Sequence, residues 1–138
     1  MPKWGQDQFN KFAGKYDLGK YVTPQFLEAD FSGDKKPDLA IPIERKSDKK
    51  KGILILFSGS NHTFVIGAGF DFENAGDDFK WATAWSIVRD KVVHEAVFNA
   101  SGEANGEREI ALERHAIKVS EEERPGRLLY FNGKRFIW

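Results

Sequence analysis

Oxygen-bearing side chains recur at close spacing in one short stretch of the chain. Asp30, Ser32, Asp34 and Asp38 stand at relative positions 1, 3, 5 and 9 of the run DFSGDKKPD. A calcium ion needs six to eight oxygen ligands, and a tight loop with alternate carboxylates can place several of them around one point. We therefore identify these four residues as candidate metal ligands and calcium as the candidate ion.

The same run, with Leu39-Ala40-Ile41 after it, resembles the calcium loops of FG-GAP and VCBS repeats, which occur in integrin-type propeller blades. It is also similar to single-domain bacterial proteins, often exported, that carry one such loop. Their Trp-containing strand and closing aromatic hairpin look similar to residues 81–85 and 130–138. The resemblance implies a calcium-loop module that is periplasmic or secreted if a signal peptide has been removed, and cytoplasmic otherwise.

The loop departs from that pattern at two positions. Ser32 stands where such loops carry Asn or Asp, and Lys35 stands where they carry Gly. A lysine at this position costs energy if its backbone must take a positive φ. The ammonium groups of Lys35 and Lys36 would also balance the acids without a metal. Two interpretations follow: the loop holds calcium, or it is a turn of the same shape that holds no ion.

A second group of acids offers a catalytic alternative. Asp71, Glu73, Asp77 and Asp78 surround Gly76 in a stretch too polar to be anything but a loop. Two of these acids would serve a small hydrolase as general acid and base if one carboxyl were desolvated in a cleft. The simpler interpretation is a solvated acidic loop.

Other catalytic and cofactor patterns are missing from the sequence. Residues 14–21 match the first part of a phosphate loop but end in Tyr21, where magnesium binding needs Ser or Thr. His62, His94 and His115 lie far apart, without the spacing of a zinc site, and the chain has no Cys. We therefore expect no cofactor other than calcium, and we favour a non-enzymatic binding or structural module over an enzyme.

Composition narrows the class of partner. Lys and Arg together number 21, as do Asp and Glu, so no net charge favours nucleic acid, and no stretch is long and apolar enough to span a membrane. The basic residues of 45–51 would bind an anionic partner, or would only keep a strand turn soluble. A protein or glycan partner would stack on aromatic side chains, unless these form the core: Trp81, Trp85, Tyr130, Phe131, Phe136 and Trp138.

Periodicity predicts an α+β fold, mainly antiparallel β, in a single domain over residues 1–138. The apolar spacing in residues 5–16 predicts a short N-terminal helix, followed by a β-sheet region over 22–138. We expect a single meandering or rolled sheet of about eight strands. Alternation at 39–43 predicts a half-buried strand, in which Pro42 indicates an edge or a bulge. The apolar run at 53–57 predicts a central strand that forms a hairpin with 63–66.

The second half of the chain reads as further strands. We predict strands at 82–89 and 91–98, a long loop over 99–107, and a break near 113–115 inside the segment 109–119. Asn132-Gly133 favours a two-residue hairpin turn, which would place Phe131 opposite Lys134 and Leu129 opposite Phe136.

Overall fold

The computed structural model describes residues 1–60, 62–72, 76–89, 92–98, 104–111, 114–121, 127–131 and 134–137. The elements of this part of the chain are the helix α1 (Lys3–Asn10) and the strands β1 (Tyr16–Leu18), β2 (Leu27–Ala29), β3 (Asp38–Arg45), β4 (Lys51–Leu56), β5 (Thr63–Gly67), β6 (Ala84–Val88), β7 (Val92–Phe98), β8 (Ala104–Ala111), β9 (Ala116–Ser120), β10 (Arg127–Phe131) and β11 (Phe136–Ile137). Each pairing between these strands is antiparallel. The predicted class, mainly antiparallel β with a short N-terminal helix, is confirmed. No helix among the described residues is long and apolar enough to cross a membrane.

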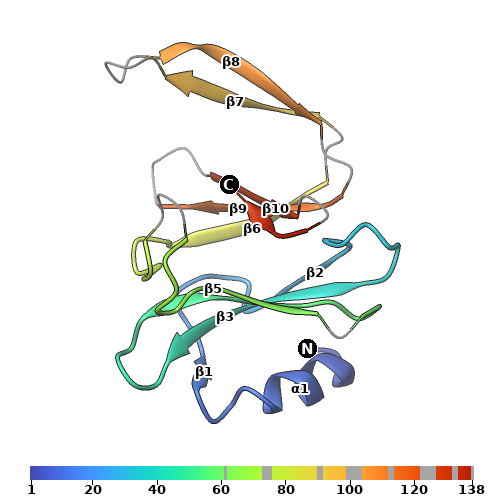
Figure 1. Cartoon of the computed structure of the whole chain (residues 1–138), viewed down its shortest axis with the longest axis vertical. Coiled ribbons are helices and arrows are strands. Elements are labelled where there is room, and N and C mark those ends of the chain that lie inside the picture. Colours follow the sequence, from blue (N-terminus) through green and yellow to red (C-terminus); the bar gives the residue numbers. More distant parts are fainter. Residues whose placement is uncertain are drawn as a thin grey trace.

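The described strands form three sheets, so the prediction of a single sheet is wrong. The first sheet has five strands in the order β1-β3-β4-β5, with β2 also paired to β3. The second sheet has four strands in the order β11-β10-β9-β6, and β7 pairs with β8 in a third sheet. In Figure 1, α1 lies below the first sheet, the second sheet lies above it, and the β7–β8 hairpin stands out at the top. The described fold is therefore layered, with the first sheet in the middle.

The first sheet is buried on both faces because its central strands carry apolar residues at consecutive positions. Leu39, Ile41 and Leu54 belong to a core cluster that includes Phe9 of α1. Ile53 and its alternate neighbours in β4 belong to a second cluster, which includes residues of the four-stranded sheet. The predicted central strand at 53–57 is confirmed, whereas the strand at 39–43 is fully buried rather than half-buried.

Pro42 lies inside β3, which has partners on both sides, and not at a sheet edge. Residues 38–40 of β3 pair with β2, residues 43–45 pair with β1, and Pro42 falls between the two partners. A proline cannot donate a hydrogen bond to a neighbouring strand. The interruption between β1 and β2 is therefore where the missing N–H costs least.

The helix is shorter than predicted. It ends at Asn10, and Tyr16 begins β1, so the sheet starts before residue 22. The backbone N–H groups of Lys15 and Tyr16 both donate to the carbonyl of Phe12 at 3.0 Å, which closes a single turn after the helix. The apolar spacing of Phe9, Phe12 and Tyr16 continues through this turn into the strand, so spacing alone does not show where the helix ends.

The strands predicted at 82–89 and 91–98 exist as β6 and β7, but β6 pairs with β9 and β7 with β8. The loop predicted over 99–107 is wrong for its last part, because β8 begins at Ala104. The predicted break near 113–115 is confirmed, since β8 ends at Ala111 and β9 begins at Ala116. The strand prediction 91–98 also implies a turn at residues 90–91, which lie outside the described residues.

The C-terminal hairpin is confirmed, but its register is not the predicted one. Phe131 lies opposite Phe136, and Tyr130 lies opposite Ile137. The pairing is shifted by two residues from that expected for a two-residue turn, so every side chain keeps its face of the sheet. Asn132 and Gly133 lie outside the described residues.

Candidate calcium loop

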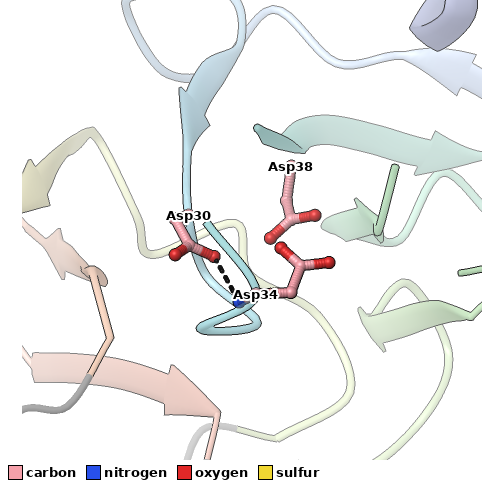
Figure 2. Close-up of side chains that lie close together, drawn as sticks. All are labelled: Asp30, Asp34 and Asp38. Atoms are coloured by element: carbon pink, nitrogen blue, oxygen red, sulfur yellow. Dashed lines mark hydrogen bonds between the residues drawn. The ribbon is translucent and has the colours of Figure 1, made fainter. Parts of the chain in front are cut away.

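The residues between β2 and β3, which we call the 30–38 loop, bring three carboxylates together. Asp30 follows β2, Asp38 opens β3, and Figure 2 shows Asp34 between them. One oxygen from each of the three lies within 4.8 Å of the others. Two oxygens bound to one calcium ion at about 2.3–2.6 Å can be separated by at most about 4.6–5.2 Å. The observed spacing therefore fits a single ion.

Ser32, the fourth predicted ligand, lies beside this group. Its hydroxyl donates to Oδ1 of Asp30 at 3.5 Å, the outer limit of a hydrogen bond. The structure thus places all four predicted residues in one loop, with the three acids at its centre and the hydroxyl at its margin.

Asp30 organises the loop through backbone donors. The N–H groups of Gly33 and Asp34 donate to Oδ1 of Asp30 at 2.8 and 3.1 Å, the second of which is the dashed line in Figure 2. The N–H of Lys35 donates to Oδ2 at 2.9 Å. An Asp side chain at the start of a turn commonly accepts such bonds, which fold the following residues around it.

The backbone makes two left-handed turns within the loop. Gly33 has φ +85°, which a glycine adopts without a steric penalty, and Lys35 has φ +65°. This conformation destabilises the folded state by about 1–2 kcal/mol when the residue carries a β-carbon. The sixth position of the loop therefore takes the conformation for which calcium loops carry glycine, and Lys35 takes it at a cost.

Asp38 is fully buried and is held by two backbone donors. The N–H of Ser32 donates to its Oδ2 at 2.9 Å, and the N–H of Ser58 donates to its Oδ1 at 3.1 Å. Burial raises the pKa of Asp38 above the ordinary value of an aspartate, and the two N–H groups partly oppose this shift. Asp38 therefore joins the 30–38 loop to the segment that follows β4.

Asp34 is the exposed member of the group. The N–H of Lys36 donates to its Oδ1 at 2.9 Å, and this bond is the main cause of its lowered pKa. Its Oδ2 lies against Gly59. Asp34 is thus an ionised carboxylate, and its Oδ2 lies between the 30–38 loop and the segment that follows β4.

Backbone N–H groups offset part of the negative charge of the loop, and the ammonium group of Lys36 adds a smaller attraction at Asp34 than the hydrogen bond from its own N–H does. Among the ion pairs of the described residues, none joins Lys35 or Lys36 to Asp30, Asp34 or Asp38. The N–H groups of residues 32–36 and 58 instead carry the bonds to these acids.

Two residues distant in sequence also hold the loop, and sequence reasoning missed both. The N–H of Asp30 donates to Nδ1 of His115 at 3.2 Å, and the N–H of His115 donates to the carbonyl of Asp30 at 3.1 Å. Arg114 donates from Nε to the carbonyl of Ser32 at 2.8 Å. No local pattern could identify these residues, because their role depends on the fold that brings β9 near the loop.

The acids of residues 71–78 have a different environment. Asp77 forms an ion pair with Lys50, which lowers the pKa of Asp77. Asp78 accepts from the N–H groups of Lys51 at 3.0 Å and Lys80 at 3.1 Å, and Asp71 is exposed. Glu73 lies outside the described residues. A general acid needs a raised pKa, whereas the shift at Asp77 has the opposite sign.

The basic residues of 45–51 are largely paired with acids. Arg45 pairs with Asp48, and Lys50 pairs with Asp77. Weaker contacts join Lys46 to Asp17 at 3.6 Å and Lys51 to Glu44 at 3.8 Å. These pairs reduce the positive field that an anionic partner would need.

Most of the aromatic side chains considered for stacking lie in or against the core. Trp85 and Phe136 are buried in the cluster between the two sheets, and Trp81 and Phe131 pack against that cluster. Tyr130 is partly buried, and Trp138 lies outside the described residues. The core interpretation therefore accounts for Trp81, Trp85, Phe131 and Phe136.

Comparison with known proteins gives no relative. No protein-family model, curated protein or solved structure matches the chain. The resemblance to FG-GAP and VCBS loops therefore remains a hypothesis from the sequence motif. The geometry of the 30–38 loop has to support any functional proposal without help from homology.

Proposed function

We propose that the protein is a non-enzymatic binding or structural module in which the 30–38 loop binds calcium as a structural ion. The observation that carries this proposal is the convergence of Asp30, Asp34 and Asp38 within the span of one calcium coordination sphere. The ion would fix the start of β3 relative to the segments that contact the loop.

Electrostatics gives the ion a physical role in this proposal. Three carboxylates at this spacing repel one another when ionised, and burial prevents water from stabilising the charge of Asp38. The backbone N–H groups offset part of this cost, and a divalent cation would offset the rest. Each carboxylate oxygen has about two acceptor positions, so Oδ2 of Asp30, which accepts the one hydrogen bond described above, keeps a position for a cation, as do Asp34 and Asp38.

The remaining ligands would be Ser32, backbone carbonyls or water, which calcium accepts readily. The positive charges of Lys35 and Lys36 would weaken binding, so we expect the affinity of an extracellular module, with a dissociation constant of about 10⁻⁴–10⁻³ M. The partner of the module would be a protein or a glycan, because equal numbers of 21 basic and 21 acidic residues give no general attraction for nucleic acid.

Thermal unfolding in calcium and in chelator tests this proposal directly. A ligand present at one hundred times its dissociation constant stabilises the folded state by about 2.7 kcal/mol, which calorimetry resolves. We expect the melting temperature to rise with calcium, and to rise less with magnesium at the same concentration, because magnesium gives up its water reluctantly.

Two substitutions separate the site from general charge effects. Asp34→Asn keeps the size of an exposed side chain and removes one negative charge from the loop, so the rise with calcium should be lost. Asp7→Asn removes an exposed charge from α1 and should leave the rise intact. Identical melting curves of the unmodified protein in calcium and in chelator would overturn the proposal.

A further inference from the structure

Arg114 bridges the 30–38 loop and the four-stranded sheet. It lies just before β9, donates from Nε to the carbonyl of Ser32 at 2.8 Å, and donates from Nη1 to the carbonyl of Phe131 at 3.3 Å. Its guanidinium carbon also lies 5.7 Å from the centre of the Phe131 ring, within the range of a cation–π contact. One side chain thus contacts both the loop and the end of β10.

The contact with the loop depends on the closed shape of the loop. A β-carbon at Gly33 would lie 2.7 Å from Nε of Arg114, so the backbone of the loop packs directly against the guanidinium group. The peptide that contains the Ser32 carbonyl also contains the N–H of Gly33, which donates to Asp30. A change in the position of the Asp30 carboxylate would therefore move the carbonyl that Arg114 binds.

The contact with β10 leads into the core between the sheets. The ring of Phe131 lies 5.1 Å from that of Phe57 and 5.6 Å from that of Phe64, measured between centroids. Phe57 follows β4 and Phe64 lies in β5, so both belong to the segments of the first sheet. Arg114 therefore contacts an aromatic cluster, formed by Phe57, Phe64 and Phe131, that lies between the first and second sheets.

We infer that Arg114 is a positioning residue that transmits the calcium state of the 30–38 loop to the four-stranded sheet. This inference rests on the proposed function, because calcium is the signal that it transmits. Calcium fixes the Asp30 carboxylate, the fixed loop holds the Ser32 carbonyl against Arg114, and Arg114 holds the end of β10. Calcium should then stabilise β9 and β10 as well as the loop that binds it.

Hydrogen exchange of the backbone amides, measured in calcium and in chelator, distinguishes these effects. In the unmodified protein we expect calcium to slow exchange at residues 32–36 and also in β9 and β10. Arg114→Gln removes the charge and the two-carbonyl bridge. In this variant, at calcium concentrations shown by titration to be saturating, the slowing should persist at residues 32–36 and be lost in β9 and β10.

Control variants keep the interpretation specific. Lys118→Gln removes an exposed cation from β9 and should leave both responses unchanged. Arg114→Lys keeps the positive charge but cannot form the same two-carbonyl bridge, so it should behave like Arg114→Gln, and it replaces that variant if circular dichroism shows loss of fold.

The possible outcomes separate the two proposals. Slowing in β9 and β10 that survives in both Arg114 variants would overturn transmission through Arg114. Loss of slowing at residues 32–36 as well would also overturn it, because Arg114 would then be needed for the loop itself. No slowing anywhere in the unmodified protein would instead refute the calcium site.

Discussion

Gly59 lies so close to Asp34 that a β-carbon at Gly59 would stand 2.0 Å from Oδ2 of that carboxylate. The neighbouring residue Ser58 donates its N–H to Asp38. The segment after β4 therefore forms one wall of the candidate site, and the space beside Asp34 exists because residue 59 has no side chain.

Gly59→Ala should weaken calcium binding with little effect on folding. The added methyl group displaces the end of a flexible, exposed side chain, so the unfolding free energy in chelator should change by less than about 0.5 kcal/mol. The displaced carboxylate of Asp34 can no longer meet the oxygens of Asp30 and Asp38. We expect a smaller rise in melting temperature with calcium than in the unmodified protein.

Gly14→Ala is the matched control for this substitution. No atom outside its immediate neighbours lies within 4 Å of the position that a β-carbon would take there. The calcium response should be unchanged in this variant. An equal response in Gly59→Ala would show that Asp34 does not act as a ligand.

Lys35→Gly should stabilise the protein and increase its affinity for calcium. The positive φ of Lys35 costs about 1–2 kcal/mol, which exceeds the roughly 0.5–1 kcal/mol of extra chain entropy that a glycine loses on folding. We therefore expect the unfolding free energy in chelator to rise by about 0.5–1 kcal/mol. Removal of one positive charge should also lower the dissociation constant for calcium.

Lys49→Gly separates these two effects. Lys49 has φ +64°, nearly that of Lys35, but it lies in the turn between β3 and β4. It should give a similar gain in chelator and no change in calcium affinity. If both variants change the affinity equally, the charge of Lys35 does not act on the site.

The site could be predicted from the sequence to the extent that it is local. Asp30, Ser32, Asp34 and Asp38 lie within one turn-rich stretch, so their spacing alone brings them together. The cost of a positive φ at Lys35 was foreseeable for the same reason. In contrast, Arg114 and His115 reach the loop only through the pairing of distant strands, which no local spacing encodes.

The fold shows the same division. The apolar run at 53–57 identified the central strand, since a strand covered on both faces needs apolar residues at every position. Sheet partners were not predictable, because β6 and β7 are adjacent in sequence but pair with β9 and β8. In the last hairpin the Asn-Gly signal identified the two strands but not their register, because a shift by two residues leaves the faces of the strands unchanged.

Asp48→Asn should change how stability depends on pH. The hydrogen bond from Arg45 lowers the pKa of Asp48 from 3.8 to about 2. The pKa of Asp48 in the folded state therefore lies below that in the unfolded state. Its contribution to the free energy of unfolding is complete above pH 3.8 and is lost as the pH falls toward about 2.

Urea unfolding of the unmodified protein and of Asp48→Asn across this range provides the measurement. The difference between their unfolding free energies should shrink as the pH falls, and it should be smaller in high salt, which screens exposed charges. Arg45→Gln should remove the same pH-dependent difference. A difference that stays constant with pH would mean that the pair with Arg45 does not stabilise the fold.

Gly52→Ala should destabilise the first sheet without affecting the calcium response. Gly52 lies in β4 opposite Gly67, and a β-carbon there would stand 2.3 Å from the carbonyl oxygen of Ile66 and 2.5 Å from the nitrogen of Ala68. These are backbone atoms of a packed strand and turn, which cannot move aside as a flexible side chain can. Forcing an extra methyl group into such a site costs about 1–3 kcal/mol.

Because Gly52 lies at the opposite end of β4 from residues 58–59, the loss measured by urea unfolding should be equal in calcium and in chelator. A loss confined to calcium would show instead that the 30–38 loop depends on the whole length of β4.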